Sequence, residues 1–363
     1  MPTEKMTYII LDAHQDLAWN MRDLDRDFRL SAYAKRKAEA GTPVAEREGL
    51  CMTGLPESLR GRVAIIFATI FANPKAAAYS LPSRHSYSTP AEAHQIGMSQ
   101  LDYYHELADS HPNIALIRTQ GELERVLATW QPETPFEQHQ VGLVVLMEGA
   151  DPIREPRAFE EWYERGVRIV GLAWSQTRYS GGTAAPGGLT KLGRELLEIM
   201  ASFRAVLDVS HMAEKAFFEA LDSYDGQIIA SHSNPRRFCD SDRHLSDAMI
   251  RRLVERNGVI GVVPYNNFLW QPGQRPARKA DASLSRVAEV IDHLCQIAGS
   301  ARHVGIGTDF DGGFGAESTP DGLDTVADLL SLAPLLAARG YSQSDVAAIL
   351  SGNFLSVLRA ALP

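Results

Sequence analysis

Eight short apolar runs recur along the chain, separated by segments with helical periodicity. The runs span residues 8–14, 62–70, 141–148, 167–174, 205–211, 227–233, 259–265 and 303–309. Runs that are apolar throughout, instead of alternating with polar residues, are typical of strands buried on both faces of a parallel sheet. The pattern therefore predicts eight parallel strands.

The segments between these runs predict helices. They span residues 90–111, 119–130, 189–204, 213–223, 246–258 and 283–300. Thr119 and Glu122 have the spacing of a capping box, and Ser246 and Gly258 suit the start and the end of a helix. Eight strands with helices between them favour a closed barrel over an open doubly wound sheet. We expect an α/β fold, a (β/α)₈ barrel of the TIM type.

The length of the chain suits one such barrel. A (β/α)₈ barrel needs about 250 residues, or more with insertions, and this chain has 363. Residues 20–60 are charged and irregular, which predicts a partly helical insertion after the first strand. Residues 270–282 predict a second excursion near the barrel mouth. Because no composition shift marks a boundary, we expect residues 1–363 to form a single barrel domain.

Charge and hydropathy narrow the classes of partner. The formal net charge is −9, which argues against a general surface for nucleic acid or anionic membrane. A single arginine can still bind a carboxylate inside an acidic protein. No run reaches the roughly 20 apolar residues of a membrane span, and the apolar stretch near the N-terminus is too short for a secretory signal. We expect a cytoplasmic protein that binds a small molecule.

Residues with metal-binding side chains end five of the apolar runs. They are His14, Asp16, Glu148, His211, His232 and Asp309. Barrel enzymes build their active sites at the carboxyl ends of the strands, where the loops converge. Each of these residues alone is more often structural, as a core histidine, a helix cap, a salt-bridged glutamate or a turn carboxylate. Their coincidence at separate strand ends predicts one shared site.

The residue types favour zinc. In a strand, His14 and Asp16 lie on the same face because side chains alternate. Imidazole and carboxylate together suit this borderline-soft ion. Glu148 follows an apolar run, where a carboxylate is costly to bury unless it is paired or binds a cation. Asp309 is our candidate for proton transfer, and Asp311 is the candidate for a turn or supporting residue.

At these residues the sequence resembles the membrane (renal-type) dipeptidase family, the M19 metallopeptidases of the amidohydrolase superfamily. The resemblance covers nearly the whole chain, in the order that the family has. Its segments are LDAHQDL, LMEGAD, GLTKLGRELL, LDVSHM, SHSNPRRFCDSDRHLSD, HVGIGTDFDG and SGNFLSVL.

The resemblance implies a site with two zinc ions (Zn²⁺) per subunit. His14 and Asp16 would hold one zinc, His211 and His232 the other, and Glu148 would bridge both. The resemblance also implies a homodimer and a small peptide-like substrate with a free carboxylate.

The remaining residues of the site also follow from the resemblance. Asp309 matches the acid that takes a proton from the bridging water and passes it to the leaving amine, and Arg243 matches the arginine that engages the substrate carboxylate. One position departs from the family, since Trp174 stands where a histidine usually stabilises the tetrahedral intermediate. Tryptophan has one N–H donor and no cationic form, so it either donates to the oxyanion or packs as a barrel wall. Arg178 and Tyr179 are further candidates for the missing donor.

These features predict a hydrolase that cleaves the amide bond of small substrates, first of all dipeptides. By resemblance, a D-residue at the carboxyl end is accepted. Loss of the family histidine would cost about 10²–10³ in rate, which favours a shifted substrate. Two alternatives remain open: another amidohydrolase, such as a deacylase of N-acyl amino acids, and a catalytically weakened barrel that binds metal.

Overall fold

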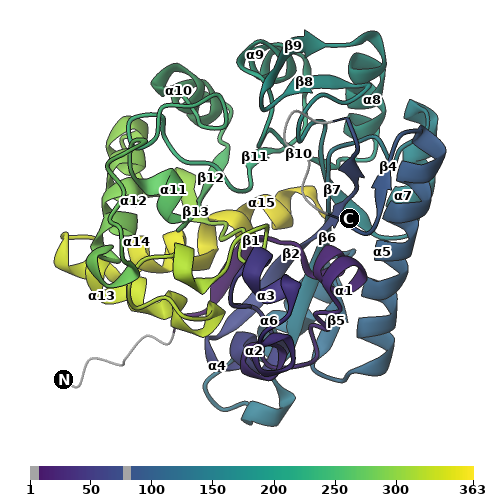
Figure 1. Cartoon of the computed structure of the whole chain (residues 1–363). Helices are drawn as coiled ribbons and strands as arrows, with labels where there is room; N and C mark the ends of the chain where they lie inside the picture. Colours follow the sequence, from purple (N-terminus) through teal and green to yellow (C-terminus); the bar gives the residue numbers. More distant parts are fainter. Residues whose placement is uncertain (1–7, 77–82) are drawn as a thin grey trace.

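Eight parallel strands close into a barrel in the computed structural model, which describes residues 8–76 and 83–363 (Figure 1). Around the barrel they are β1 (Ile10–Gln15), β2 (Val63–Phe71), β6 (Val141–Glu148), β7 (Val167–Gly171), β10 (Val206–Asp208), β11 (Ile228–Ala230), β12 (Val259–Val262) and β13 (Val304–Ile306). The pairing of Asp12 with Ile306 closes the ring between β1 and β13. Each predicted run contains one barrel strand, which confirms the (β/α)₈ prediction.

The strands are held by burial on both faces. Every residue of β1, β2 and β6 is buried, and β2 pairs with β6 continuously from Ile65↔Gly142 to Phe71↔Glu148. Strands of this kind have no solvent face, which explains why the runs are apolar throughout. A short extra strand that the sequence did not predict, β5 (Ile114–Leu116), extends the sheet beside the first residues of β6.

The six predicted helices are present (Figure 1). They are α5 (Pro90–Ser110), α6 (Gln120–Ala128), α8 (Lys191–Ser202), α9 (Glu214–Ser223), α10 (Asp247–Glu255) and α12 (Ser285–Ala298). The capping box of Thr119 and Glu122 is confirmed at the start of α6. Ser246 caps α10 by accepting the N–H of Met249. Within residues 8–76 and 83–363, no helix is both long and apolar enough to cross a membrane.

The insertion after β1 is helical in part, as predicted. It carries α1 (Leu17–Leu24), α2 (Ala32–Glu39), α3 (Pro43–Glu48) and α4 (Leu55–Arg60). The buried Arg26 ties it together, because its guanidinium donates to both carboxylate oxygens of Glu39 at 2.8 and 2.9 Å and to the carbonyl of Gly49 at 2.8 Å. Residues 270–282 form a loop with one 3₁₀ turn, Lys279–Asp281.

Two small sheets at the carboxyl ends of the strands were not predicted. The first is the hairpin of β8 (Ser180–Gly182) and β9 (Ala185–Leu189), and the second pairs β3 (Asn73–Pro74) with β4 (Ser86–Tyr87). The β8–β9 segment is rich in glycine and lacks an apolar run. The hairpin follows β7 and reaches the mouth of the barrel, where Thr183 and Ala184 line a cavity.

Candidate metal centre

The six residues predicted from the strand ends lie together at the carboxyl end of the barrel. His14 lies in β1 and Glu148 is the last residue of β6, as expected. Asp16, His211, His232 and Asp309 lie beyond the last residues of their strands, which corrects the expectation that they end them. His211 and Asp309 adopt left-handed backbone, with φ of 64° and 58°. Such conformations are uncommon outside glycine and cluster at functional sites.

Glu148 forms the middle of the cluster. One of its carboxylate oxygens, Oε1, lies 3.2 Å from Nε2 of His211 and 3.2 Å from Nε2 of His232. The other, Oε2, lies 3.7 Å from Nε2 of His14. A single carboxylate therefore reaches imidazoles from three different loops and strands. This arrangement is the one that a bridging ligand requires.

A second set of carboxylates gathers around His14. Its Nε2 lies 3.9 Å from Oδ1 of Asp16 and 4.0 Å from Oδ1 of Asp309. The hydroxyl of Thr69 donates to Asp16, and the backbone N–H of Asp309 donates to the carbonyl of His14 at 3.1 Å. Side chain and backbone contacts thus fix both acids against β1.

The cluster fits metal ions of the zinc type. Among the described residues, three groups of three side chains have ligand atoms within 4.8 Å of one another. Two of these groups face the cavity at the barrel mouth, namely Glu148 with His211 and His232, and His14 with Asp16 and Asp309. Nε2 of His211 lies 3.1 Å from Nε2 of His232, a separation that two nitrogens bound at about 2.0–2.1 Å to one tetrahedral ion would approach. Nε2 of His14 is buried and, among the described residues, has no hydrogen-bond partner. Buried polar atoms rarely lack partners, which points to a ligand at this position.

Burial and charge shift the pKa values in this cluster. Burial lowers the pKa of His14, but the nearby carboxylate of Glu148, aided by Asp16 and Asp309, raises it to about 10. Burial raises the pKa of Asp16 to about 6 and raises that of Asp309 well above its ordinary value. Burial, with the charge of Arg243, lowers the pKa of His211 to about 4. Strongly shifted groups in a cleft are typical of functional sites.

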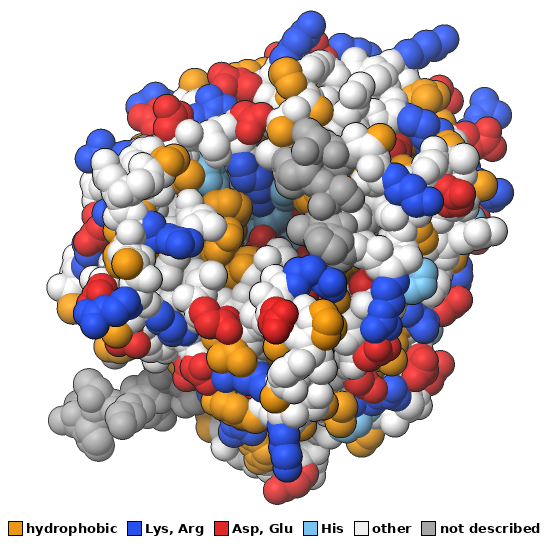
Figure 2. All heavy atoms as spheres, in the orientation of Figure 1, with side chains coloured by type: hydrophobic (Ala, Val, Ile, Leu, Met, Phe, Trp, Pro, Cys, Tyr) orange, Lys and Arg blue, Asp and Glu red, His pale blue; other side chains and the backbone are white. Residues whose placement is uncertain are grey.

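A cavity of about 350 Å³ opens onto the cluster. Figure 2 shows this face hollowed near its centre, with histidine, basic and acidic side chains visible inside the hollow. Its lining includes Asp16, Glu148, His211 and Asp309 of the cluster. Arg243 also lines it, with Nη2 donating to the carbonyl of His232 at 2.8 Å. The structure thus brings the predicted arginine to the same cavity as the predicted acid.

Trp174 forms part of the cavity wall. Its ring centroid lies 5.0 Å from that of Phe71 and 6.1 Å from that of His211. Arg178 and Tyr179, the other candidates for a donor, face elsewhere, since Arg178 donates to the carbonyl of Arg154 at 2.9 Å and the hydroxyl of Tyr179 to that of Ile153. Neither lines the cavity, so the expectation that they replace the family histidine is wrong.

The sequence did not predict the residues that support the imidazoles. The hydroxyl of Thr183, on the β8–β9 hairpin, lies 3.0 Å from Nδ1 of His211. Ser231 and Asp208 lie behind His14 and His232. In the sequence, Ser231 is visible only as a serine directly before His232, and Asp208 only as an acid in the LDVSHM segment. Both are equally compatible with residues that simply end a strand.

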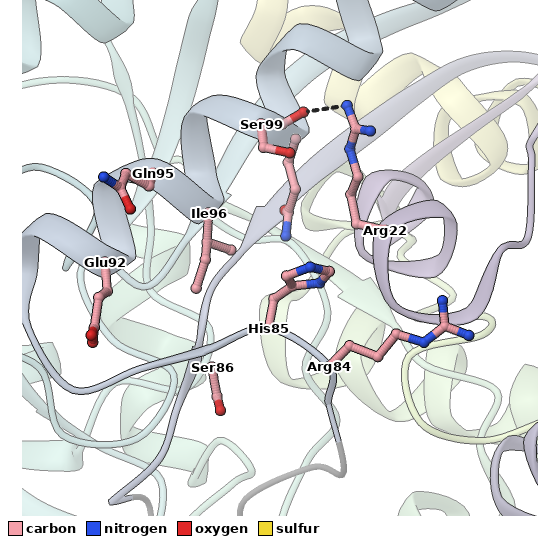
Figure 3. A pocket seen from close by; sticks show the side chains of 9 residues that line it. Arg22, Arg84, His85, Ser86, Glu92, Gln95, Ile96 and Ser99 are labelled. Carbon is pink, nitrogen blue, oxygen red and sulfur yellow. Dashed lines mark hydrogen bonds between the residues drawn. The ribbon is translucent and has the colours of Figure 1, made fainter.

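A separate cavity of about 340 Å³ lies between α1 and the N-terminal half of α5 (Figure 3). Its lining includes Arg22, Arg84 and His85, and Arg22 donates to the carbonyl of Ser99 at 2.9 Å. It shares no residue with the cavity at the cluster. Residues of the metal-binding cluster therefore line the cavity at the barrel mouth and not this one.

Comparison with known proteins places the chain in a family. The model of the membrane dipeptidase family (peptidase family M19) matches residues 5–362. An uncharacterized protein in the pqqA 5′ region of Klebsiella pneumoniae is 34% identical over 249 residues, which are 66% of this chain and 89% of that protein. The chain spans only about half to two thirds of the length of other curated relatives that it matches.

Two solved structures share the fold over 98% of this chain and 99% of their own. One is the dipeptidase AC, a metallopeptidase of family M19, with a TM-score of 0.79 and 24% identity. The other is a metallopeptidase from Rhodobacter sphaeroides liganded with a phosphinate mimic of the dipeptide L-Ala-D-Ala, with a TM-score of 0.78 and 22% identity. With the match of the family model across residues 5–362, these findings show that the chain belongs to the membrane dipeptidase family, peptidase family M19, and is a metallo-dipeptidase by that membership.

Proposed function

We propose that the chain hydrolyses the amide bond of dipeptides at a centre with two zinc ions per subunit. His14 and Asp16 would hold one ion, His211 and His232 the other, and Glu148 would bridge them. The observation that carries this proposal is the position of the Glu148 carboxylate, within 3.2–3.7 Å of all three imidazoles. When bound, the zinc ions supply Lewis acidity that polarises a carbonyl and lowers the pKa of water.

Asp309 is the proposed proton carrier. It lines the cavity beside the cluster, and burial raises its pKa well above the ordinary value. A carboxyl with a raised pKa can both accept a proton from the attacking water and return it to the leaving amine near neutral pH. Its oxygen Oδ1 lies 4.0 Å from Nε2 of His14, which keeps it next to the reacting groups.

Arg243 is the proposed anchor for the free carboxylate of the substrate. The residue is mostly buried at the cavity wall, and its guanidinium faces the ring of Phe268, with 5.6 Å between Cζ and the ring centroid. A planar guanidinium recognises carboxylates with paired hydrogen bonds. A fixed anchor in a cavity of about 350 Å³ limits the length of the substrate. The L-Ala-D-Ala mimic in the R. sphaeroides relative supports a D-residue at the carboxyl end.

Trp174 is proposed to shape the substrate side of the same cavity, where Trp19 and Phe71 also line the wall. The proposal further includes a homodimer, as the resemblance implies, and a cytoplasmic location. Light scattering of the purified protein and fractionation of cells test these two points.

The decisive experiment combines metal content with a substrate panel. Elemental analysis is expected to find two zinc ions per subunit. L,L- and L,D-dipeptides are expected to be cleaved, tripeptides to be spared, and chelation to abolish turnover until zinc is restored. Preferred cleavage of N-acyl amino acids would instead establish a deacylase, and bound zinc without turnover of any substrate would establish a weakened metal-binding barrel. Turnover in protein without metal would refute the mechanism.

A further inference from the structure

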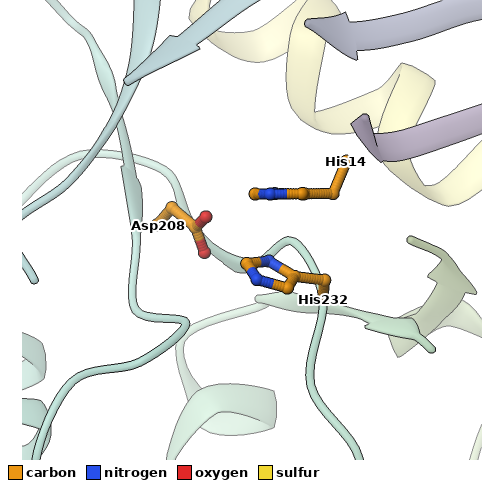
Figure 4. Close-up of side chains that lie close together, drawn as sticks. All are labelled: His14, Asp208 and His232. Carbon is orange, nitrogen blue, oxygen red and sulfur yellow. The ribbon is translucent and has the colours of Figure 1, made fainter. Parts of the chain in front are cut away.

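A single hydroxyl lies behind both halves of the cluster. Oγ of Ser231 lies 2.7 Å from Nδ1 of His232, 3.2 Å from Nδ1 of His14 and 2.5 Å from Oδ2 of Asp208. Figure 4 shows the two imidazoles and the Asp208 carboxylate around one space. These three side chains are spaced closely enough to hold an ion, but the serine hydroxyl already contacts each of them. The group is therefore a hydrogen-bonded support and not a third metal site.

Counting protons fixes the direction of these bonds. A hydroxyl has one proton and two lone pairs, and a carboxylate only accepts. Oδ1 of Asp208 accepts the backbone N–H groups of Ser210 at 3.0 Å and Ser231 at 2.9 Å. Oδ2 accepts the hydroxyl proton of Ser231. The two lone pairs of that hydroxyl are left for its next two shortest contacts, Nδ1–H of His232 at 2.7 Å and Nδ1–H of His14 at 3.2 Å, ahead of the Ser210 hydroxyl at 3.3 Å.

This pattern sets the form of both rings. An imidazole that donates from Nδ1 presents the lone pair of Nε2, and Nε2 of each ring faces Glu148. We propose that Ser231, held by Asp208, is a positioning residue that fixes the tautomer and the orientation of His14 and His232 together. The inference rests on the proposed function, in which these rings bind different zinc ions. One serine then supports both ions.

The barrel builds this position rigidly. Ser231 and Asp208 are buried, at the ends of the adjacent strands β11 and β10. The carbonyl oxygen of Ser231 lies where a Cβ on Gly261 or Gly307 would come within 1.9 or 1.8 Å. Only glycine in β12, at Gly261, and directly after β13, at Gly307, leaves room for the Ser231 backbone.

The test compares Ser231→Ala with Ser210→Ala. Ser210 is a matched control, because its hydroxyl lies 3.3 Å from that of Ser231 and accepts the N–H of His232 at 3.2 Å, yet contacts no imidazole nitrogen. Zinc affinity is measured by competition with a chelator, and tautomers by ¹⁵N NMR of histidine-labelled protein with zinc. Ser231→Ala is expected to weaken the binding of both zinc ions by about 10–100-fold. It is also expected to shift the Nδ1 signals of His14 and His232. Ser210→Ala is expected to keep the parent affinities and tautomers.

Asp208→Asn provides an isosteric second variant, should Ser231→Ala fail to fold. Its amide oxygen would still accept the two backbone N–H groups, so its NH₂ group would face Ser231 and donate. The serine proton would then turn to one imidazole and force the wrong tautomer, which is expected to lower zinc affinity despite unchanged shape. Parent-like affinities and tautomers in these variants, or loss of one zinc alone in Ser231→Ala, would overturn the shared role. Parent protein that binds no zinc would instead refute the proposed function.

Discussion

Asp309 and Asp311 lie two residues apart on one turn, and they face different structures. Both have left-handed backbone, with φ of 58° and 66°. Asp309 faces the cavity, with Oδ1 4.0 Å from Nε2 of His14. Asp311 instead accepts the backbone N–H groups of Met52 at 2.8 Å and Thr53 at 3.0 Å. The turn thus joins the metal centre to the insertion after β1.

Asp309→Asn tests the proton carrier. The amide keeps the shape of the side chain but cannot accept a proton and return it, so kcat is expected to fall by about 10²–10⁴-fold. Zinc content is expected to stay at the parent level, because Asp309 is not a proposed ligand. Steady-state kinetics and elemental analysis measure both. A parent-like kcat would remove Asp309 from the mechanism, and loss of zinc would reassign it as a ligand.

Asp311→Asn is expected to act on stability. Besides the two backbone N–H groups, the Asp311 carboxylate accepts the hydroxyl of Thr53 at 2.6 Å and lies 3.8 Å from Nη1 of the buried Arg26. Hydrogen bonds to a charged group contribute about 1.5–3 kcal/mol each, so the free energy of unfolding is expected to drop by about that amount. Urea unfolding of the zinc-loaded protein measures it. An unchanged unfolding curve together with a large loss of kcat would contradict the division between the two acids.

The sequence predicted the barrel because a strand that is buried on both faces is a run of consecutive apolar residues. Strands such as Val141–Glu148 are apolar up to their last residue, and a run of that kind can be recognised without knowing its neighbours. The strand ends were placed less well. The run 205–211 continues past Asp208, where β10 ends, because Val209 is also buried, and burial alone does not show that the backbone has left the sheet.

The supporting residues were missed for a different physical reason. The bond between Ser231 and Asp208 joins two adjacent strands, and it depends on the register that pairs Asp208 with Ile229. No local pattern contains that register. Thr183 lies on a hairpin without apolar alternation. Ligand residues could be predicted because strand ends converge, whereas their partners depend on contacts between strands.

Gly312→Ala tests how tightly the acids pack at the mouth. A Cβ at this position would lie 2.2 Å from Oδ1 of Asp309 and 3.0 Å from Oδ2 of Asp16. The added methyl group must displace a carboxylate, so both kcat and zinc affinity are expected to fall. Gly352→Ala is the control, since a Cβ there meets its neighbours at ordinary contact distances of 3.5 Å or more. Equal effects of the two substitutions would show that the loss is general.

Trp174→His tests the departure from the family. A histidine at this wall would restore an electrostatic donor, and kcat/KM for L,L-dipeptides is expected to rise, by up to about 10²–10³-fold. Trp174→Phe keeps an aromatic ring against Phe71 without any N–H donor, and it separates packing from donation. Assay of the parent and both variants on the same substrate panel measures the change. A lower kcat/KM in both variants would show that the tryptophan itself selects the substrate.

Zinc binding is expected to release protons, because His14 is a cation in the metal-free protein and carries a second ring proton on Nε2, besides the one on Nδ1. Burial lowers the pKa of His14, but Glu148, Asp16 and Asp309 outweigh it and raise the pKa from 6.5 to about 10. At pH 8 the folded metal-free protein is therefore protonated at His14, whereas the unfolded chain is not. This group stabilises the metal-free fold fully below pH 6.5, and the stabilisation is lost as the pH rises through 10.

Zinc needs the lone pair of Nε2, so the proton of His14 must leave on binding. Zinc affinity is thus expected to increase with pH up to about 10. The contribution of His14 to the stability of the metal-free fold changes in the opposite direction, because it decreases as the pH rises. Calorimetric titration at pH 8 in buffers of different ionisation enthalpy is expected to show release of at least one proton per subunit. His14→Asn lacks both the titrating ring and a proposed zinc ligand, so it is expected to reduce the number of protons released for each zinc ion bound. Binding of zinc at pH 8 with no proton released would show that His14 lies neutral in the metal-free cluster, and the charge balance described around Glu148 would be wrong.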